Sequence, residues 1–176
     1  RLVMGGTLEC TSPQPSDAGY LALEVTMNGQ DYSADGVQFE YQPAVHVHAL
    51  EPATGPAGGG SFVNVTGSGF SQRAALLGYV SCRFNLTSVA AAWVSPTELH
   101  CIAPEHAAGV VGVEVTQNEQ QHTADGVQYE YRHVMAHMLH PAAGPVHGGT
   151  LVELRGSGFD MPAARGLHCQ FGTSET

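Results

Sequence analysis

Lysine is absent from this sequence, and charged side chains of any kind are few. Only 12% of its 176 residues are charged, and six arginines face 16 acidic residues for a net charge of −10. Nucleic-acid binding depends on cationic side chains that contact phosphates, so this balance predicts no nucleic-acid partner. No run of 18 apolar residues occurs, so we expect no membrane-spanning helix and no direct membrane contact. Residues 1–30 do not show a basic region followed by an apolar region and small residues, which is the order in a secretion signal. This predicts that the segment begins inside a mature protein.

Catalytic motifs are also missing. The sequence contains no G-x-S-x-G turn, no H-E-x-x-H pair and no phosphate-binding loop, and its acidic residues are scattered along the chain. The sequence therefore predicts a protein that is not an enzyme and that needs no cofactor.

What the sequence does contain is an internal repeat. "GPAGGGSFVNVTGSGF" (55–70) returns as "GPVHGGTLVELRGSGF" (144–159), an offset of 89 residues with nine of 16 positions identical. "SADGVQFEY" (33–41) returns as "TADGVQYEY" (123–131) at an offset of 90. A period near 89 residues indicates tandem domains of one kind.

Each repeat has the pattern of short strands separated by turns. Val63 and Val65 share one strand face, and Leu21, Leu23 and Val25 alternate in the same way as Val111, Val113 and Val115. Asp35-Gly36 and Asp125-Gly126 are expected to form hairpin turns. No stretch shows a sustained helical period, so we predict an all-β fold, with Phe70 and the single tryptophan, Trp93, in its core.

The ordered positions of the repeat resemble the IPT/TIG domain family. They are Pro52, Gly55-Pro56, Gly59-Gly60, Gly67-Ser68-Gly69-Phe70, Cys82-x-Phe84, Leu99-x-Cys101-x-x-Pro104 and a final aromatic-x-Tyr. The resemblance implies tandem immunoglobulin-like β-sandwiches of roughly 80 to 100 residues each. Such domains occur in plexin and hepatocyte-growth-factor-receptor ectodomains, in fibrocystin-like surface proteins, beside some starch-active enzymes, and in Rel-type transcription factors. The fold by itself does not select among these functions.

The resemblance also pairs Cys82 with Cys101 in a disulfide, which we expect on neighbouring strands. Two buried thiols, or half of a zinc site, are the alternatives, although the sequence has no C-x-x-C pair. Two N-glycosylation sequons begin at Asn64 and Asn85. Asn64 is expected on a solvent-facing strand surface, and Asn85 in a loop, where the modifying enzyme has better access. Together these features predict a secreted or cell-surface glycoprotein and argue against the Rel-type function.

The ends of the sequence cut across the repeat. Residues 51–139 make one complete domain, residues 1–50 the back part of another, and residues 140–176 the front part of a third. Cys10 and Cys169 correspond to Cys101 and Cys82, so we expect them to pair across copies or with flanking repeats. Head-to-tail neighbours would then complete each partial domain, either within one long polypeptide or between separate subunits that exchange strands. An arbitrary cut within a longer protein is the alternative.

Ten histidines raise the question of a metal site. His46 and His48 are expected on the same strand face, where they could ligate a metal, but polar surface between domains is the preferred interpretation. The function predicted from these observations is a structural repeat of an extracellular, glycan-coated fibre or stalk, with adhesive and mechanical roles. The alternative is a set of spacer domains in a plexin- or fibrocystin-like receptor ectodomain.

Overall fold

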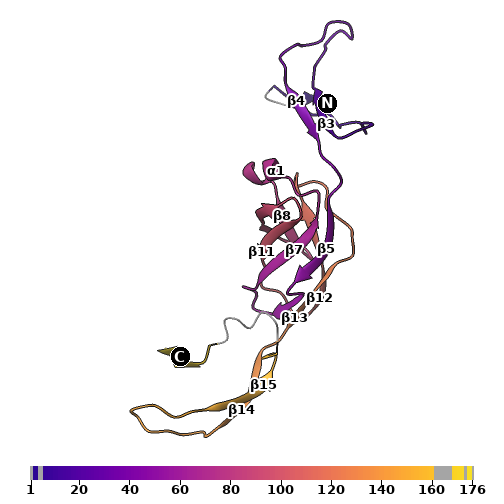
Figure 1. Cartoon of the computed structure of the whole chain (residues 1–176). Helices are drawn as coiled ribbons and strands as arrows, with labels where there is room; N and C mark the ends of the chain where they lie inside the picture. The colour runs from indigo at the N-terminus through magenta and orange to yellow at the C-terminus, as the bar shows by residue number, and fades with distance from the viewer. Residues whose placement is uncertain (1, 4–5, 161–167, 173, 176) are drawn as a thin grey trace. The chain divides into compact units, whose positions relative to one another are not determined.

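The chain divides into two compact units, Arg1–Ala44 and Val45–Thr176 (Figure 1). The structure, a computed structural model, describes residues 2–3, 6–160, 168–172 and 174–175. Among them strands predominate, and each unit is described here by itself.

The second unit contains a complete β-sandwich. Its first sheet has the strand order β10-β11-β7-β5, in which neighbours are antiparallel. Figure 1 shows β5 and β7 side by side. The bounds are β5 His46–Glu51, β7 Phe62–Ser68, β10 Ala92–Ser95 and β11 Glu98–Ile102.

The second sheet has the order β6-β13-β12-β8-β9. Its neighbours are antiparallel except for β6 and β13, which run parallel. The bounds are β6 Thr54–Pro56, β8 Ser81–Phe84, β9 Thr87–Ala90, β12 Gly109–Thr116 and β13 Gln128–Arg132. Two packed and mostly antiparallel sheets of this kind confirm the predicted all-β, immunoglobulin-like class.

Alternating apolar positions of both sheets form the core, as the sequence pattern predicts. Val63 and Val65 are fully buried, whereas Phe62, on the opposite face of β7, is exposed. Val111, Val113 and Val115 meet them from β12, and Tyr129 and Tyr131 from β13. Phe70 is buried, and Trp93 packs against the core while donating a hydrogen bond from Nε1 to the Phe70 carbonyl oxygen at 3.0 Å.

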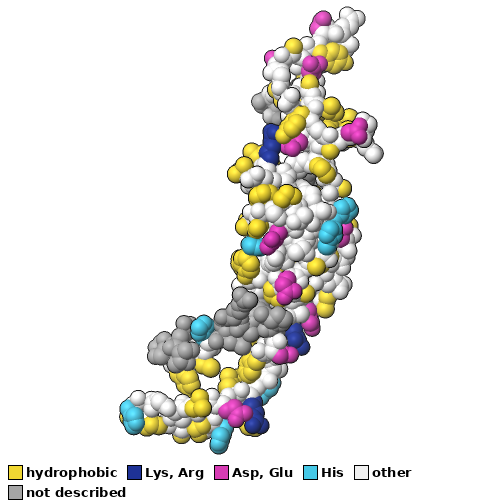
Figure 2. All heavy atoms as spheres, in the orientation of Figure 1, with side chains coloured by type: hydrophobic (Ala, Val, Ile, Leu, Met, Phe, Trp, Pro, Cys, Tyr) yellow, Lys and Arg dark blue, Asp and Glu magenta, His cyan; other side chains and the backbone are white. Residues whose placement is uncertain are grey.

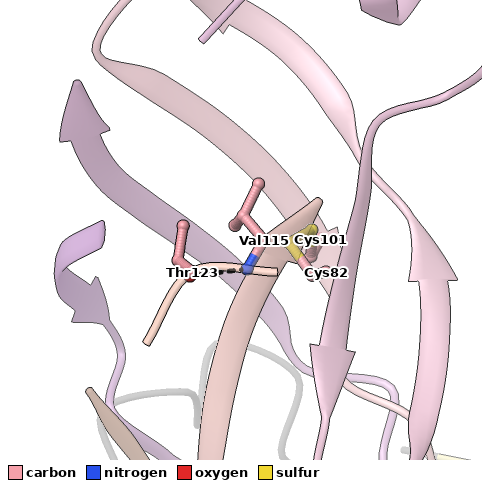
Figure 3. Close-up of a disulfide and its surroundings, with 4 residues drawn as sticks. All are labelled: Cys82, Cys101, Val115 and Thr123. Carbon is pink, nitrogen blue, oxygen red and sulfur yellow. Dashed lines mark hydrogen bonds between the residues drawn. A yellow bond between two sulfur atoms is a disulfide. The ribbon is translucent and has the colours of Figure 1, made fainter. Parts of the chain in front are cut away.

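A disulfide joins Cys82 to Cys101 across this core (Figure 3). The two cysteines were expected on neighbouring strands, but Cys82 lies on β8 in one sheet and Cys101 on β11 in the other. They meet because both side chains point inward, and both residues are buried. The bond therefore links the two layers of the sandwich.

The structure also contains a short helix, α1 Gln72–Leu76, which the expectation of strands alone missed. Ser71 precedes it as the N-cap and accepts a hydrogen bond on its hydroxyl oxygen from the Ala74 amide at 3.2 Å. A serine before an alanine-containing run is a known start signal for a helix, but five residues are too few to show a helical period.

The hairpin turns are not at Asp35-Gly36 and Asp125-Gly126, where the sequence predicted them. Asn118 occupies the turn after β12, where its side-chain oxygen accepts hydrogen bonds from the Gln120 and Gln121 amides at 3.1 and 3.0 Å. Asn28 does the same in the first unit, with the amides of residues 30 and 31. Asp125 and Gly126 lie after this turn, in the segment that leads to β13. The Asp125 carboxylate bonds to β5.

The first unit repeats part of this design. Strand β3, Gly19–Ala22, pairs with β4, Gln38–Tyr41, in the register that β12 and β13 show 90 residues later. Strands β1, Leu2–Val3, and β2, Thr7–Leu8, pair as well. Residue Leu21 is 52% exposed, whereas its counterpart Val111 is 8% exposed. Five apolar residues form this exposed face of the first unit: Leu21, Leu23, Val25, Val37 and Phe39.

The end of the chain repeats the beginning of the sandwich. Strand β14, Met135–His140, pairs with β15, Glu153–Ser157, in the register of β5 and β7, and the same bulge interrupts it. Two short strands follow, β16 Gln170–Phe171 and β17 Ser174–Glu175.

The strand pairing moves the boundaries drawn from the sequence. A boundary between residues 50 and 51 would divide β5, but β5 pairs with β7, and its Val47 and Leu50 are buried in the sandwich core. The complete sandwich therefore includes residues 46–50, which the sequence assigned to the preceding part. At the other end, β14 pairs with β15, so residues 135–139 group with the following part.

Candidate functional site

Asp125 connects the loop between β12 and β13 to the start of β5. One of its carboxylate oxygens lies 2.9 Å from Nδ1 of His46, and the other accepts a hydrogen bond from the Val47 amide at 2.7 Å. The hydrogen bond from His46 and then that from Val47 lower the pKa of Asp125. Because β5 and β12 belong to different sheets, this contact is a second link between the two layers.

The same contact bears on the suggested metal pair. His46 directs Nδ1 at a carboxylate, and a bulge in the β5–β7 pairing falls between Val47 and Ala49, next to His48. Over the described residues, no group of three or more histidine, cysteine, aspartate or glutamate side chains is arranged to hold a metal ion. The arrangement of His46 therefore supports a structural role.

Asn85 lies at the tip of the hairpin that β8 and β9 form. It and Leu86 are the two residues between paired Phe84 and Thr87, and its φ of 55° is one that asparagine adopts more readily than most residues. Its side chain is exposed, with Nδ2 3.2 Å from Nε2 of His106. The sequon asparagine thus stands in a turn, as expected.

Asn64 lies in the middle of β7, between β11 and β5. It is directly opposite His100 on one side and Glu51 on the other. Its side chain faces away from the core but is only partly exposed, and its Oδ1 is buried without a hydrogen-bond partner among the described residues. Neighbouring Phe62 makes an edge contact with the His100 ring at 4.5 Å. The expected solvent-facing surface is therefore crowded around this amide.

An aromatic cluster joins core side chains of β8 and β13. Phe84, Tyr129 and Tyr131 contact one another edge to face, and the His106 ring stacks on Tyr131 at 5.0 Å. Burial, with a smaller contribution from Tyr129, raises the pKa of Tyr131 to about 12. Its hydroxyl has no hydrogen-bond partner in the part of the chain that the structure describes.

A buried hydroxyl on the arm after β12 was not recognised from the sequence. Thr123 accepts a hydrogen bond on Oγ1 from the Val115 amide at 3.0 Å, close to the disulfide (Figure 3). Ser33 makes the same bond to the Val25 amide in the first unit, also at 3.0 Å. The repeated A-D-G segment is preceded by serine in one copy and by threonine in the other. The hydroxyl that both share was the sequence signal that could have indicated this hydrogen bond.

The remaining two cysteines, Cys10 and Cys169, are exposed thiols on the parts that flank the complete sandwich. On the face that Figure 2 shows, basic side chains are few and apolar side chains reach the surface in the first unit. Among the described helices none has the length and apolar character needed to cross a membrane.

The fold and its disulfide define an immunoglobulin-like sandwich, and residues 46–131 match the IPT/TIG domain family. This part of the chain is therefore an IPT/TIG domain, as the sequence motifs predicted. The start of the match at residue 46 agrees with the inclusion of β5.

Similar proteins include human Plexin-B1, which is 33% identical over 123 residues, or 65% of this chain, and mouse Plexin-B2, which is 34% identical over 67 residues, or 38%. The chain spans only 6% and 4% of these relatives. A solved structure of the plexin A4 extracellular region aligns with 71% of this chain and 10% of its own, at 20% identity and a TM-score of 0.47. The segment is extracellular or at the cell surface, as predicted.

Proposed function

We propose that this segment serves as spacer domains in the extracellular part of a plexin-like cell-surface receptor. The similarity to Plexin-B1 carries the proposal, because it covers 65% of the chain and so extends beyond the residues of the one matched domain. In this role the segment holds a ligand-binding module at a distance from the membrane and performs no catalysis.

The internal structure of the domain suits a spacer. The disulfide and the Asp125 contact each join the two sheets, in addition to their apolar packing. A spacer has to keep its length, and cross-links between layers resist relative sliding of the sheets.

We propose further that the flanking parts belong to neighbouring IPT/TIG domains. The β3–β4 register supports assigning the first unit to the back of one domain, and the β14–β15 register supports assigning the end of the chain to the front of another. The exposed face of the first unit would pack on a front half like β5–β7, supplied by a head-to-tail neighbour in the same polypeptide. In that arrangement Cys10 and Cys169 form the disulfides of those domains with partners from flanking repeats.

Surface labelling and membrane extraction test the receptor role. An antibody raised against residues 46–131 would be used on cells that make the protein, after biotinylation of surface proteins and extraction with alkaline carbonate. A receptor is biotinylated and stays in the membrane pellet after carbonate treatment. Release of all the protein into the supernatant, with filaments visible in negative stain, would refute the receptor role and support an extracellular fibre instead.

A further inference from the structure

We propose that the folded IPT/TIG domain carries an N-linked glycan on Asn85 and leaves Asn64 unmodified. The inference requires only that the chain passes through the secretory pathway, and it is independent of the spacer role. Both residues begin a complete sequon, so the sequence alone does not separate them. The environments of the two amides in the fold do.

The chemistry requires an accessible amide nitrogen. The Asn85 Nδ2 would attack the anomeric carbon of a lipid-diphosphate-linked oligosaccharide, forming a C–N bond while the C–O bond to the diphosphate breaks. The lipid diphosphate leaves, and the amide gives up one of its two protons. After folding, the product must keep the sugar in solvent and retain any contacts of the remaining N–H.

Asn85 meets both requirements. It stands at the tip of a two-residue turn, followed by Leu86 at 87% exposure and by the exposed sequon residue Thr87. A sugar on Nδ2 therefore projects from the end of the hairpin without displacing a buried group.

The contact with His106 leaves one amide proton available for the sugar bond. His106 Nδ1 lies 2.8 Å from the Ala107 carbonyl oxygen, so Nδ1 carries the proton of the ring and donates it there. Nε2 is then the acceptor for one Asn85 N–H at 3.2 Å. The second N–H is the one replaced by the sugar. His106 also lines an open hollow of about 690 Å³ together with Ala57, Gly58 and Glu105.

Asn64 does not meet the requirements. Strands flank it on both sides, its carbonyl oxygen is buried, and the contacting rings of Phe62 and His100 occupy the same outer face. The hydroxyl of its sequon residue, Thr66, donates a hydrogen bond to the Ala49 carbonyl oxygen at 3.3 Å within the sheet. A branched glycan at this position would have to displace these side chains from the middle of a four-stranded sheet.

The test uses the whole chain, secreted from eukaryotic cells behind a signal peptide. Two matched pairs of variants remove one sequon each: Asn85→Gln and Thr87→Ala, against Asn64→Gln and Thr66→Ala. Peptide N-glycosidase treatment, followed by mass spectrometry of tryptic or chymotryptic peptides, reports which asparagine becomes aspartate. Intrinsic fluorescence of Trp93 checks that each secreted variant is folded.

We expect one glycosidase-sensitive shift for the natural sequence, the same shift for both position-64 sequon variants, and no shift for Asn85→Gln and Thr87→Ala. If Asn64→Gln is not secreted, Thr66→Ala provides the same comparison with the asparagine in place. A shift that persists in Asn85→Gln, deamidation of Asn64 in secreted folded protein, or an unshifted natural chain would each overturn the proposal.

Discussion

Replacing Gly67 by alanine should separate β5 from β7 and destabilise the complete sandwich. A Cβ at Gly67 would fall inside contact distance of the His46 carbonyl oxygen and 2.5 Å from Cζ of Phe70. The carbonyl belongs to the backbone of β5, and Phe70 is only 2% exposed, so neither atom can move away cheaply. Restoring an ordinary contact of about 3.5 Å requires the strands to part by about 1 Å.

The magnitude follows from these two contacts. Overpacking a core costs about 1–3 kcal/mol, and weakening one or two strand hydrogen bonds adds about 1 kcal/mol each. We therefore expect Gly67→Ala to lower the free energy of unfolding by about 3 kcal/mol. With a urea m-value of about 1.5 kcal/mol/M for a domain of this size, the midpoint should fall by about 2 M.

Urea denaturation followed by Trp93 fluorescence measures this change. Trp93 is the only tryptophan and packs against the core of this domain, so its signal reports this domain alone. Gly112→Ala is the matched strand control, because its Cβ would meet no atom within 4 Å and should change stability by less than about 1 kcal/mol. Gly156→Ala repeats the collision in β15, against Met135 and Phe159, and should leave the Trp93 midpoint unchanged. Equal midpoints for the Gly67 and Gly112 variants would refute the reasoning.

Three further predictions concern the links and the core of the same domain. Replacing Cys82 and Cys101 together by alanine should lower the free energy of unfolding by about 3 kcal/mol, because the unfolded chain is no longer constrained by a bond between residues 19 apart. The urea midpoint should fall, and reduction of the natural chain should lower it by the same amount. Asp125→Asn should cost about 1 kcal/mol near neutral pH. Because the folded-state pKa of Asp125 lies below its ordinary 3.8, the difference between variant and natural chain should vanish as the pH falls through that lowered pKa, in denaturation curves taken at several pH values. Tyr131→Phe should raise stability by about 1 kcal/mol, since it removes a buried hydroxyl without a partner among the described residues. Because the Tyr131 pKa rises to about 12, the natural domain should lose stability between pH 10 and 12, and the variant should lose less, in urea denaturation curves taken across this pH range.

The repeat and its alternating strands were predictable because both depend on local order in the sequence. Val63 and Val65 are buried as their two-residue period predicts, and the 89- and 90-residue offsets return as identical strand registers. The family motifs gave the Cys82–Cys101 bond. Each of these features can be read from residues close together or from a fixed spacing.

Features that depend on the third dimension were not predictable in the same way. The sequence spacing of Cys82 and Cys101 does not say that their strands lie in opposite sheets. Asp125-Gly126 has the composition of a hairpin turn, but the Asp125 carboxylate bonds to a strand 78 residues earlier in the chain. The sequon at Asn64 looks as open as that at Asn85 until β5 and β11 are placed on either side of it.

The disulfide also sets how far the domain can extend under a pulling force. Force applied at the two ends of the domain reaches Cys82 and Cys101 through the chain outside their loop, and the loop between them, a sequence separation of 19, stays closed. A fully extended chain spans at most about 3.4 Å per residue, so the bond withholds about 60 Å of length from an unfolded domain. Reduction would release that length, which makes the reach of the segment under load dependent on the redox state outside the cell.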